Sequence, residues 1–80
     1  MKPQKNMVIL RKKKNLTQVQ AAKKIGISYS MLAMMEAGHR VGTYETLKKV
    51  ANFYGVTVDE LLDENFFENK SRIKRESNTA

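Results

Sequence analysis

Two short amphipathic patterns follow each other between residues 17 and 38, and a glycine separates them. In the first, Thr17 and Gln20 have the spacing of a capping box, so a helix is predicted to begin at Gln18. Its apolar face at helical spacing consists of Ala21, Ala22 and Ile25. The alanines allow a second helix to cross closely, and Gly26 can take the left-handed conformation that ends a helix.

The second pattern predicts a helix that Ser28 caps and Gly38 ends. At about 100° per residue, Leu32 and Met35 share the side that can pack on the first helix. The opposite, outward side carries Tyr29, Ser30, Ala33, Met34 and Ala37. Two short helices joined by a tight turn are typical of a helix-turn-helix, and this motif indicates double-stranded DNA as a partner.

Before this motif, Asn6 can cap a helix that runs to about Lys14. Its core-facing residues would be Met7, Leu10 and Ile9. The four apolar residues 7–10 also fit a short strand, because periodicity does not decide so short a run. Asn15 tolerates the left-handed conformation that ends such a helix.

After Gly38 the pattern predicts two more helices. Thr43 caps the first and Gly55 closes it. Its apolar stripe consists of Leu47, Val50, Ala51 and Tyr54. Thr57 and Glu60 form a second capping box for a short last helix. The apolar residues of that helix are Val58, Leu61 and Leu62.

These patterns predict one all-helical domain of five helices over residues 6–67. Residues 1–5 are expected to form a flexible arm. Residues 68–80 are expected to form a polar tail that is disordered from about residue 70. A chain of 80 residues has a marginal core, which favours association with a partner subunit.

Charge is divided unevenly along the chain. Residues 1–40 hold nine Lys or Arg against one acid, Glu36, for a net +8, whereas residues 41–80 hold six bases against seven acids, for −1. The half that contains the helix-turn-helix is therefore the half that a polyanion such as DNA attracts. Lysines 12, 13, 14, 23 and 24 also fit simple solvation of exposed helix faces.

The composition argues against catalysis and metal binding. The chain has no cysteine and a single histidine, His39, which fits a solvated residue or a phosphate contact. The acids of residues 59–64 look like solvation of helix ends rather than an acid–base pair. We expect no enzymatic activity, no metal and no cofactor. The apolar runs 7–10 and 31–35 are too short for a membrane span, so we expect a cytoplasmic protein with no membrane partner.

From about Met7 to Leu62 the chain resembles the Cro and phage-repressor type of helix-turn-helix proteins, the XRE family. The residues that carry the resemblance are Leu10-Arg11, Leu16-Thr17-Gln18, Ala22, Gly26, Ser28, Leu32, Glu36, Gly38, Thr46-Leu47, Val50-Ala51, Gly55-Val56 and Asp59-Glu60-Leu61-Leu62. The resemblance implies a five-helix, lambda-repressor-like fold. It also implies a sequence-specific DNA-binding transcriptional regulator, which we expect to act as a homodimeric repressor on a palindromic operator.

The resemblance further implies which residues contact DNA. Gln18, at the start of its helix, matches a position that contacts a phosphate. The positions that match those facing the major groove are Tyr29, Ser30, Ala33 and Met34. The predicted helix of residues 29–37 is the recognition helix of the motif. Around it we expect further phosphate contacts from Ser28, Arg40 and Thr43. Lys12 and Lys13 are additional candidates, Met34 also fits core packing, and Tyr44 is either a phosphate ligand or a core aromatic.

Two features stand out against the family pattern. Members commonly have Arg, Gln, Asn or Lys on the outward face, whereas Ala33 and Met34 offer no strong hydrogen-bonding group. Contact with thymine methyls, readout of DNA shape and modest specificity all remain open. Arg11 and Glu36 match the family pair that ties the first helix to the end of the recognition helix. We interpret Glu36 as structural, because phosphates would repel an acid that faces DNA.

The segment after the last helix bears on partners. We expect Leu62, Phe66 and Phe67 to lie at the dimer interface, and the alternative is that the two phenylalanines fold back on Met7 and Ile9. A hypothesis from another class is a protein-interaction module, such as an antitoxin whose tail binds a protein partner. A controller of a restriction-modification system is a further possibility among regulators.

Overall fold

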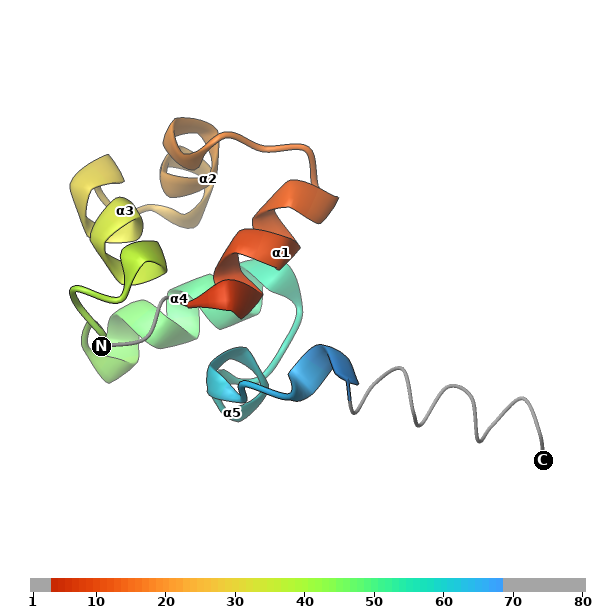
Figure 1. Cartoon of the computed structure of the whole chain (residues 1–80). Coiled ribbons are helices and arrows are strands. Elements are labelled where there is room, and N and C mark those ends of the chain that lie inside the picture. The colour runs from red at the N-terminus through yellow and green to blue at the C-terminus, as the bar shows by residue number, and fades with distance from the viewer. Residues whose placement is uncertain (1–3, 69–80) are drawn as a thin grey trace, which may run out of the picture.

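Five helices make up most of the computed structural model, which describes residues 4–68 (Figure 1). They are α1 (Lys5–Lys13), α2 (Gln18–Ile25), α3 (Tyr29–Ala37), α4 (Tyr44–Tyr54) and α5 (Val58–Leu62). Residues 66–68 are also helical, and no strand occurs within residues 4–68. The predicted all-helical fold class is therefore confirmed, and residues 7–10 are helix rather than strand.

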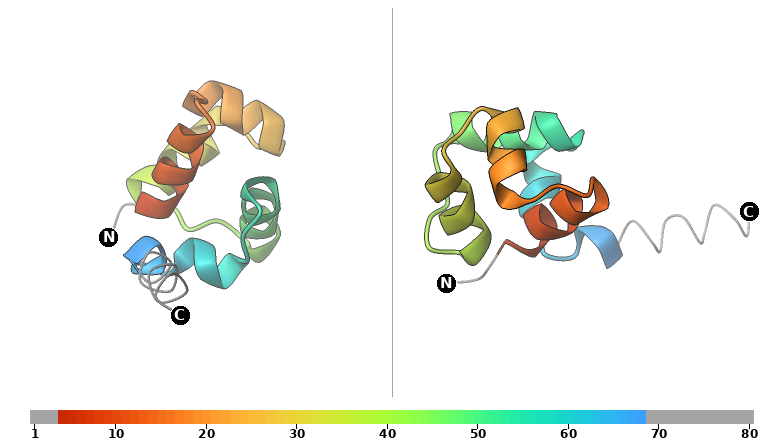
Figure 2. Two further views of the ribbon diagram at one scale, coloured as in Figure 1. Left: turned by 90° about the vertical axis from the view of Figure 1, so that its right-hand side faces the viewer. Right: turned by 90° about the horizontal axis from the view of Figure 1, so that it is seen from above.

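The helices form a closed ring around the core. Helix α1 contacts α3 and α5, α2 contacts α3 and α4, and α4 contacts α5, an arrangement that Figures 1 and 2 show from three sides. The main core cluster consists of Met7, Met35, Leu47, Val50, Ala51, Tyr54 and Leu61. A smaller cluster of Ala21, Ala22 and Leu32 lies where α2 crosses α3. The small side chains of α2 thus allow the close approach that the motif requires.

The predicted helix starts and ends of α2 to α5 are present. The side chains of Thr17, Ser28, Thr43 and Thr57 each accept a hydrogen bond from a backbone N–H of the first turn that follows. Both capping boxes, at α2 and α5, are complete. Gly26 ends α2 with a φ of 93°, and Asn15 takes the left-handed conformation with a φ of 58°. Local chemistry therefore fixes these boundaries.

Helix α1 differs from the prediction in three ways. It begins at Lys5 without a side-chain cap, so Asn6 is not the cap. Instead Asn6 is buried, and its Nδ2 donates to the backbone oxygens of Leu61 at 2.9 Å and Asp63 at 2.6 Å. Position 6 faces the end of α5, where free carbonyl groups need donors. Ile9 is 36% exposed and lies outside the core.

The predicted arm is also shorter than residues 1–5. The backbone N–H of Gln4 donates to the backbone oxygen of Glu36 at 2.9 Å, and Lys5 already belongs to α1. Residues 1–3 lie outside the described residues, as do residues 69–80 of the predicted tail. The prediction of a disordered tail therefore stays a prediction.

The two phenylalanines after α5 lie close to α1. Phe66 is buried at 9% exposure, and its ring meets that of Phe67 edge-on at 5.1 Å. The Nζ of Lys13 lies 5.0 Å from the centre of the Phe67 ring. Phe66 is thus part of the folded monomer, whereas Phe67 is only half-buried.

Within residues 4–68, no helix has the length and apolar character that crossing a membrane requires.

Candidate nucleic-acid interface

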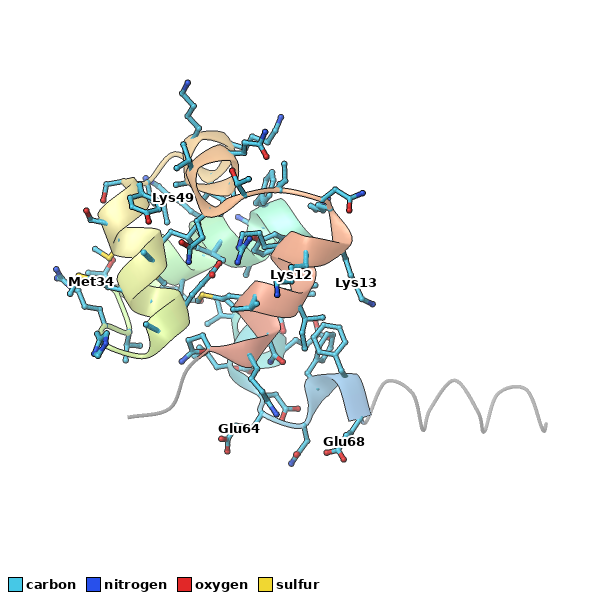
Figure 3. The ribbon with its side chains drawn as sticks, turned by 45° about the horizontal axis from the view of Figure 1, so that its top comes forward. Lys12, Lys13, Met34, Lys49, Glu64 and Glu68 are labelled. Atoms are coloured by element: carbon cyan, nitrogen blue, oxygen red, sulfur yellow. The ribbon has the colours of Figure 1, made fainter. Side chains whose placement is uncertain are left out.

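One face of α3 is open to solvent. Ser30 is exposed, Ala33 is half-buried and Met34 is 40% exposed, and the three positions form a stripe at helical spacing. Tyr29, 51% exposed, flanks the stripe at the first position of the helix. Figure 3 shows Met34 on the outer side of α3. Met35 is the fully buried methionine that packs in the core, whereas Met34 is not part of the core.

Both ends of α3 are held by hydrogen bonds. The Ser28 Oγ accepts from the backbone N–H of Met31 at 3.1 Å. At the other end, the backbone N–H groups of His39 and Arg40 donate to the Met34 backbone oxygen at 2.9 and 3.3 Å. The backbone of Arg40 is therefore fixed next to α3 while its side chain is exposed.

The loop that follows packs tightly on the core. Gly42 has a φ of 86°, and a Cβ added there would lie 3.3 Å from the Cε of Met35. A side chain at position 42 would therefore strain the backbone and push against Met35, so glycine is favoured there. The loop leads to Thr43, whose Oγ1 accepts from the Thr46 N–H at 3.2 Å. The hydroxyl of Thr43 is exposed beside the start of α4.

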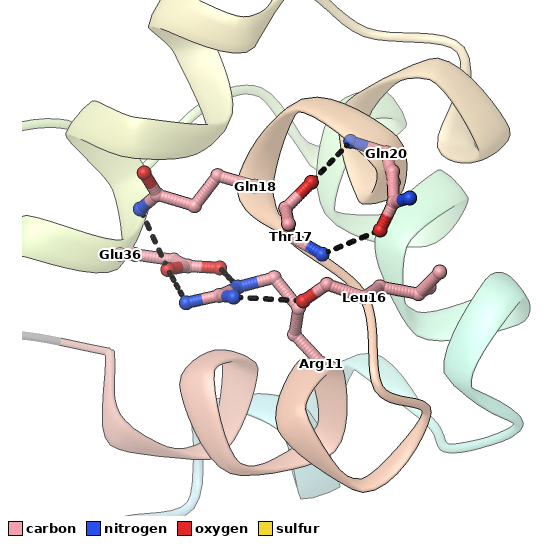
Figure 4. Close-up of polar contacts among 6 residues, drawn as sticks. All are labelled: Arg11, Leu16, Thr17, Gln18, Gln20 and Glu36. Atoms are coloured by element: carbon pink, nitrogen blue, oxygen red, sulfur yellow. Dashed lines mark hydrogen bonds and ion pairs between the residues drawn. The ribbon is translucent and has the colours of Figure 1, made fainter.

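A buried ion pair joins α1 to the end of α3 (Figure 4). Arg11 donates from Nε to Oε2 of Glu36 at 2.8 Å and from Nη2 to Oε1 at 3.1 Å. Its Nη1 donates to the backbone oxygen of Leu16 at 2.9 Å. The side chains are 12% and 4% exposed, and the hydrogen bonds to Glu36 raise the pKa of Arg11 above its ordinary value. Glu36 thus faces α1 and not the solvent.

Gln18 extends this network to α2. Its Nε2 donates to Oε1 of Glu36 at 2.9 Å, so the side-chain amide is engaged within the protein (Figure 4). This contact could not be predicted from the sequence, because Gln18 and Glu36 are 18 residues apart. The backbone N–H groups of Gln18 and Val19, in the first turn of α2, have no partner among the described residues.

Several lysines lie over aromatic rings. The Nζ of Lys14 lies 5.4 Å from the centre of the Phe53 ring, and Lys13 covers Phe67 in the same way. Figure 3 shows Lys13 on the opposite side of the molecule from Met34, so Lys13 is a weak candidate for a contact near α3. Tyr44 is 67% exposed, with the Lys48 Nζ 5.7 Å from its ring centre, so it is not a core aromatic.

Acidic side chains gather at the other end of the fold. Exposed acids on α5 and directly after it are Asp59, Glu60, Asp63, Glu64 and Glu68. Figure 3 shows Glu64 and Glu68 projecting away from the bundle on the side of α5. Lys5 of α1 lies beside Glu64 and Glu68, so acidic and basic side chains meet on this side of the fold. No cluster of His, Asp and Glu within residues 4–68 could hold a metal ion.

Comparison with known proteins agrees with this geometry. Residues 9–61 match the helix-turn-helix family of the XRE type. The chain therefore belongs to this family of DNA-binding transcriptional regulators. It is 36% identical over 72 residues to the HTH-type transcriptional activator BcrR of Enterococcus faecalis. That match covers 82% of the chain but only 35% of the relative. No solved structure matches the chain.

Proposed function

We propose that this chain binds double-stranded DNA sequence-specifically by placing α3 in the major groove. The observation that carries the proposal is the solvent-open stripe of α3, whose opposite side is buried. The residues proposed to face bases are Tyr29, Ser30, Ala33 and Met34. Because both helix ends are hydrogen-bonded, α3 keeps its orientation when it docks, which lowers the entropic cost of binding.

The proposed phosphate contacts surround this helix. Arg40 supplies a charged side chain from a fixed backbone, and the hydroxyls of Ser28 and Thr43 can each donate a hydrogen bond to a phosphate oxygen. At Gln18 we propose that the free backbone N–H group makes the contact, together with that of Val19, because the side-chain amide is bonded to Glu36. These contacts position α3 without selecting a sequence.

We further propose a homodimer that reads a palindromic operator, with the two recognition helices about 34 Å apart. Partly exposed apolar side chains on α1, α5 and the segment after α5 supply a candidate interface, and two of them, Ile9 and Phe67, line one groove. The full set is Ile9, Leu62 and Phe67. Phe66 is buried in the monomer and would support this surface from beneath.

The proposed regulatory effect is repression, through occupation of a promoter by the dimer. Activation is the second candidate, because the relative from Enterococcus faecalis is named as an activator. The chain spans about a third of that relative's length, so the two proteins are comparable only over the DNA-binding part. A reporter gene placed downstream of a binding site selected with this protein distinguishes the two effects, because repression lowers its expression and activation raises it.

The salt dependence of binding to duplex DNA tests the central proposal. If each subunit neutralises roughly three to five phosphates, the slope of log affinity against log salt should be about −5 to −9 for a dimer. Arg40→Ala should weaken binding to specific and random DNA by similar factors and make the slope shallower by about one per subunit. Lys13→Ala is the matched control and should leave the slope unchanged. A slope near zero for the parent protein would contradict DNA binding.

A further inference from the structure

We infer that the recognition helix reads thymine through its methyl group, with Met34 and Ala33 as the residues that make the contact. The inference rests on the proposed binding of α3 in the major groove and names the kind of base pair it selects.

The exposed face of α3 contains no charged side chain and no amide. The sequence of the helix is YSMLAMMEA, and its single charged residue, Glu36, is 4% exposed and bonded to Arg11 and Gln18. The strong side-chain pairings in the major groove are Arg or Lys with guanine, Asn or Gln with adenine, and an acid with cytosine. The outward positions of this helix offer none of these side chains, and only the hydroxyls of Ser30 and Tyr29 can bond to a base edge there.

The apolar part of the face is well placed for contact. Met34 is 40% exposed, and Ala33 beside it is half-buried. Ala37, exposed one turn after Ala33, continues the apolar stripe. Within α3, the hydroxyls of Ser30 and Tyr29 are the only polar side-chain groups on this face, and both lie toward the start of the helix.

Such a surface favours one base over the others. The thymine C5-methyl is the only apolar group at the floor of the major groove. An apolar side chain pressed against G or C would cover hydrogen-bonding edges without giving them a partner, which is costly. Against thymine the same side chain gains the burial of a methyl group. Met34 and Ala33 therefore select thymine both by attraction and by exclusion of the other bases.

Replacement of thymine by deoxyuridine tests this directly, because it removes the methyl and leaves base pairing intact. A high-affinity duplex is first selected from random DNA, and each thymine of a half-site is then replaced in turn. At one or two positions per half-site we expect affinity to fall roughly fourfold for each buried methyl. The remaining positions serve as internal controls.

Two variants of nearly equal side-chain size assign the effect to α3. Met34→Leu keeps an apolar group and should keep the sensitivity to deoxyuridine. Met34→Gln exchanges it for an amide and should abolish that sensitivity at the affected pair, while favouring adenine contacts there. Circular dichroism checks that both variants fold, which is expected because position 34 is exposed.

The outcomes are distinguishable. If selection enriches no duplex even at low salt, the proposed DNA binding itself fails. If the selected duplex is bound tightly but every deoxyuridine substitution changes affinity less than about 1.5-fold, DNA binding stands and methyl readout is overturned. If Met34→Gln keeps the full sensitivity, another residue reads the methyl, and the assignment to Met34 is overturned.

Discussion

The hydroxyl of Tyr54 is buried close to the ion pair of Arg11 and Glu36 and has no hydrogen-bond partner among residues 4–68. It is the only such side-chain atom among the described residues. Burial, with a further contribution from the nearby Glu36 carboxylate, raises the pKa of Tyr54 from 10.0 to about 12. Arg11 opposes this shift but does not cancel it. A buried hydroxyl without a partner costs free energy, so its removal carries little penalty.

Tyr54→Phe should therefore change stability in a pH-dependent way. The folded state keeps a proton that the unfolded state releases above pH 10, so Tyr54 loses its contribution to stability as pH rises from 10 to about 12. Below pH 9 the free energy of unfolding of the variant should lie within about 1 kcal/mol of that of the parent. Between pH 9 and pH 12 this difference in free energy of unfolding should shift by about 2 kcal/mol in favour of the variant.

Urea unfolding of both proteins at several pH values measures this difference. Tyr44→Phe is the matched control, because the ring of Tyr44 is 67% exposed and its hydroxyl gains little from folding. That variant should follow the pH dependence of the parent. A Tyr54→Phe protein that also followed it would show that the hydroxyl is solvated in the folded state.

The helices can be predicted from the sequence where residues close to one another in the chain determine their ends and their buried faces. The caps at Thr17, Ser28, Thr43 and Thr57 each involve residues three apart, and the apolar stripes repeat within one helix, so the pattern predicts α2 to α5. The contacts between helices do not follow in this way. Asn6 bonds to Leu61 across 55 positions, and only the folded chain brings them together.

The same distinction applies to the candidate site. The outward positions of α3 could be predicted from helical periodicity alone, and the pairing of Arg11 with Glu36 from the family resemblance. The use of Gln18 as a third member of that network could not, because nothing in its local sequence marks an amide that bonds to α3. The local sequence around a glutamine at a helix start is the same whether its side chain contacts a phosphate or a carboxylate.

At the scale of the helices, the ion pair is the strongest test of how α1, α2 and α3 are held together. Glu36→Ala leaves Arg11, whose side chain is 12% exposed, with only the Leu16 backbone oxygen as a partner. Breaking a fully buried pair costs about 3 to 5 kcal/mol, and the partial exposure of Arg11 sets the expected cost at the lower end, about 3 kcal/mol, which is still a large part of the roughly 5 to 15 kcal/mol that stabilises a typical domain. We expect a clearly lower midpoint in urea unfolding followed by circular dichroism.

The control for this prediction is Glu45→Ala, which removes an exposed acid from α4. Its effect should stay within about 0.5 kcal/mol. DNA binding of Glu36→Ala should persist under conditions where the variant is folded. An unchanged melting temperature combined with lost binding would show that Glu36 serves DNA recognition rather than the fold.

For the whole molecule, the distribution of charge and of apolar surface favours different sides of the fold for the proposed DNA contact and the proposed subunit contact. The basic residues of α1 and α2 and the loop after α3 belong to the half of the chain with net charge +8. The acids of α5 and residues 63–68 lie beside α1, with Lys5 as a basic neighbour, and Glu64 and Glu68 lie away from Met34 of α3 (Figure 3), so DNA would repel that side of the fold. Association between subunits on that side would leave α3 free for the groove.

A shallow groove on that side gives the dimer proposal a concrete location. It has a volume of about 350 Å³ and lies between α1 and the segment after α5. Its lining residues are Lys5, Asn6, Ile9, Glu64, Asn65, Phe67 and Glu68. The mixture of basic and acidic residues around apolar side chains suits a two-fold contact, in which each copy presents both partners of an ion pair.

The combined substitution of Leu62 and Phe67 by Ser tests this surface. Leu62 is 38% exposed and Phe67 half-buried, so the fold should survive with a modest loss of stability. We expect a helical monomer by sedimentation, with weaker operator binding because each half-site is bound independently. Phe66 stays unchanged in this variant, because it is 9% exposed and its replacement would destabilise the folded monomer itself. If the double variant stays dimeric, the interface lies elsewhere, and the exposed side of α4 with Tyr44 becomes the next surface to substitute.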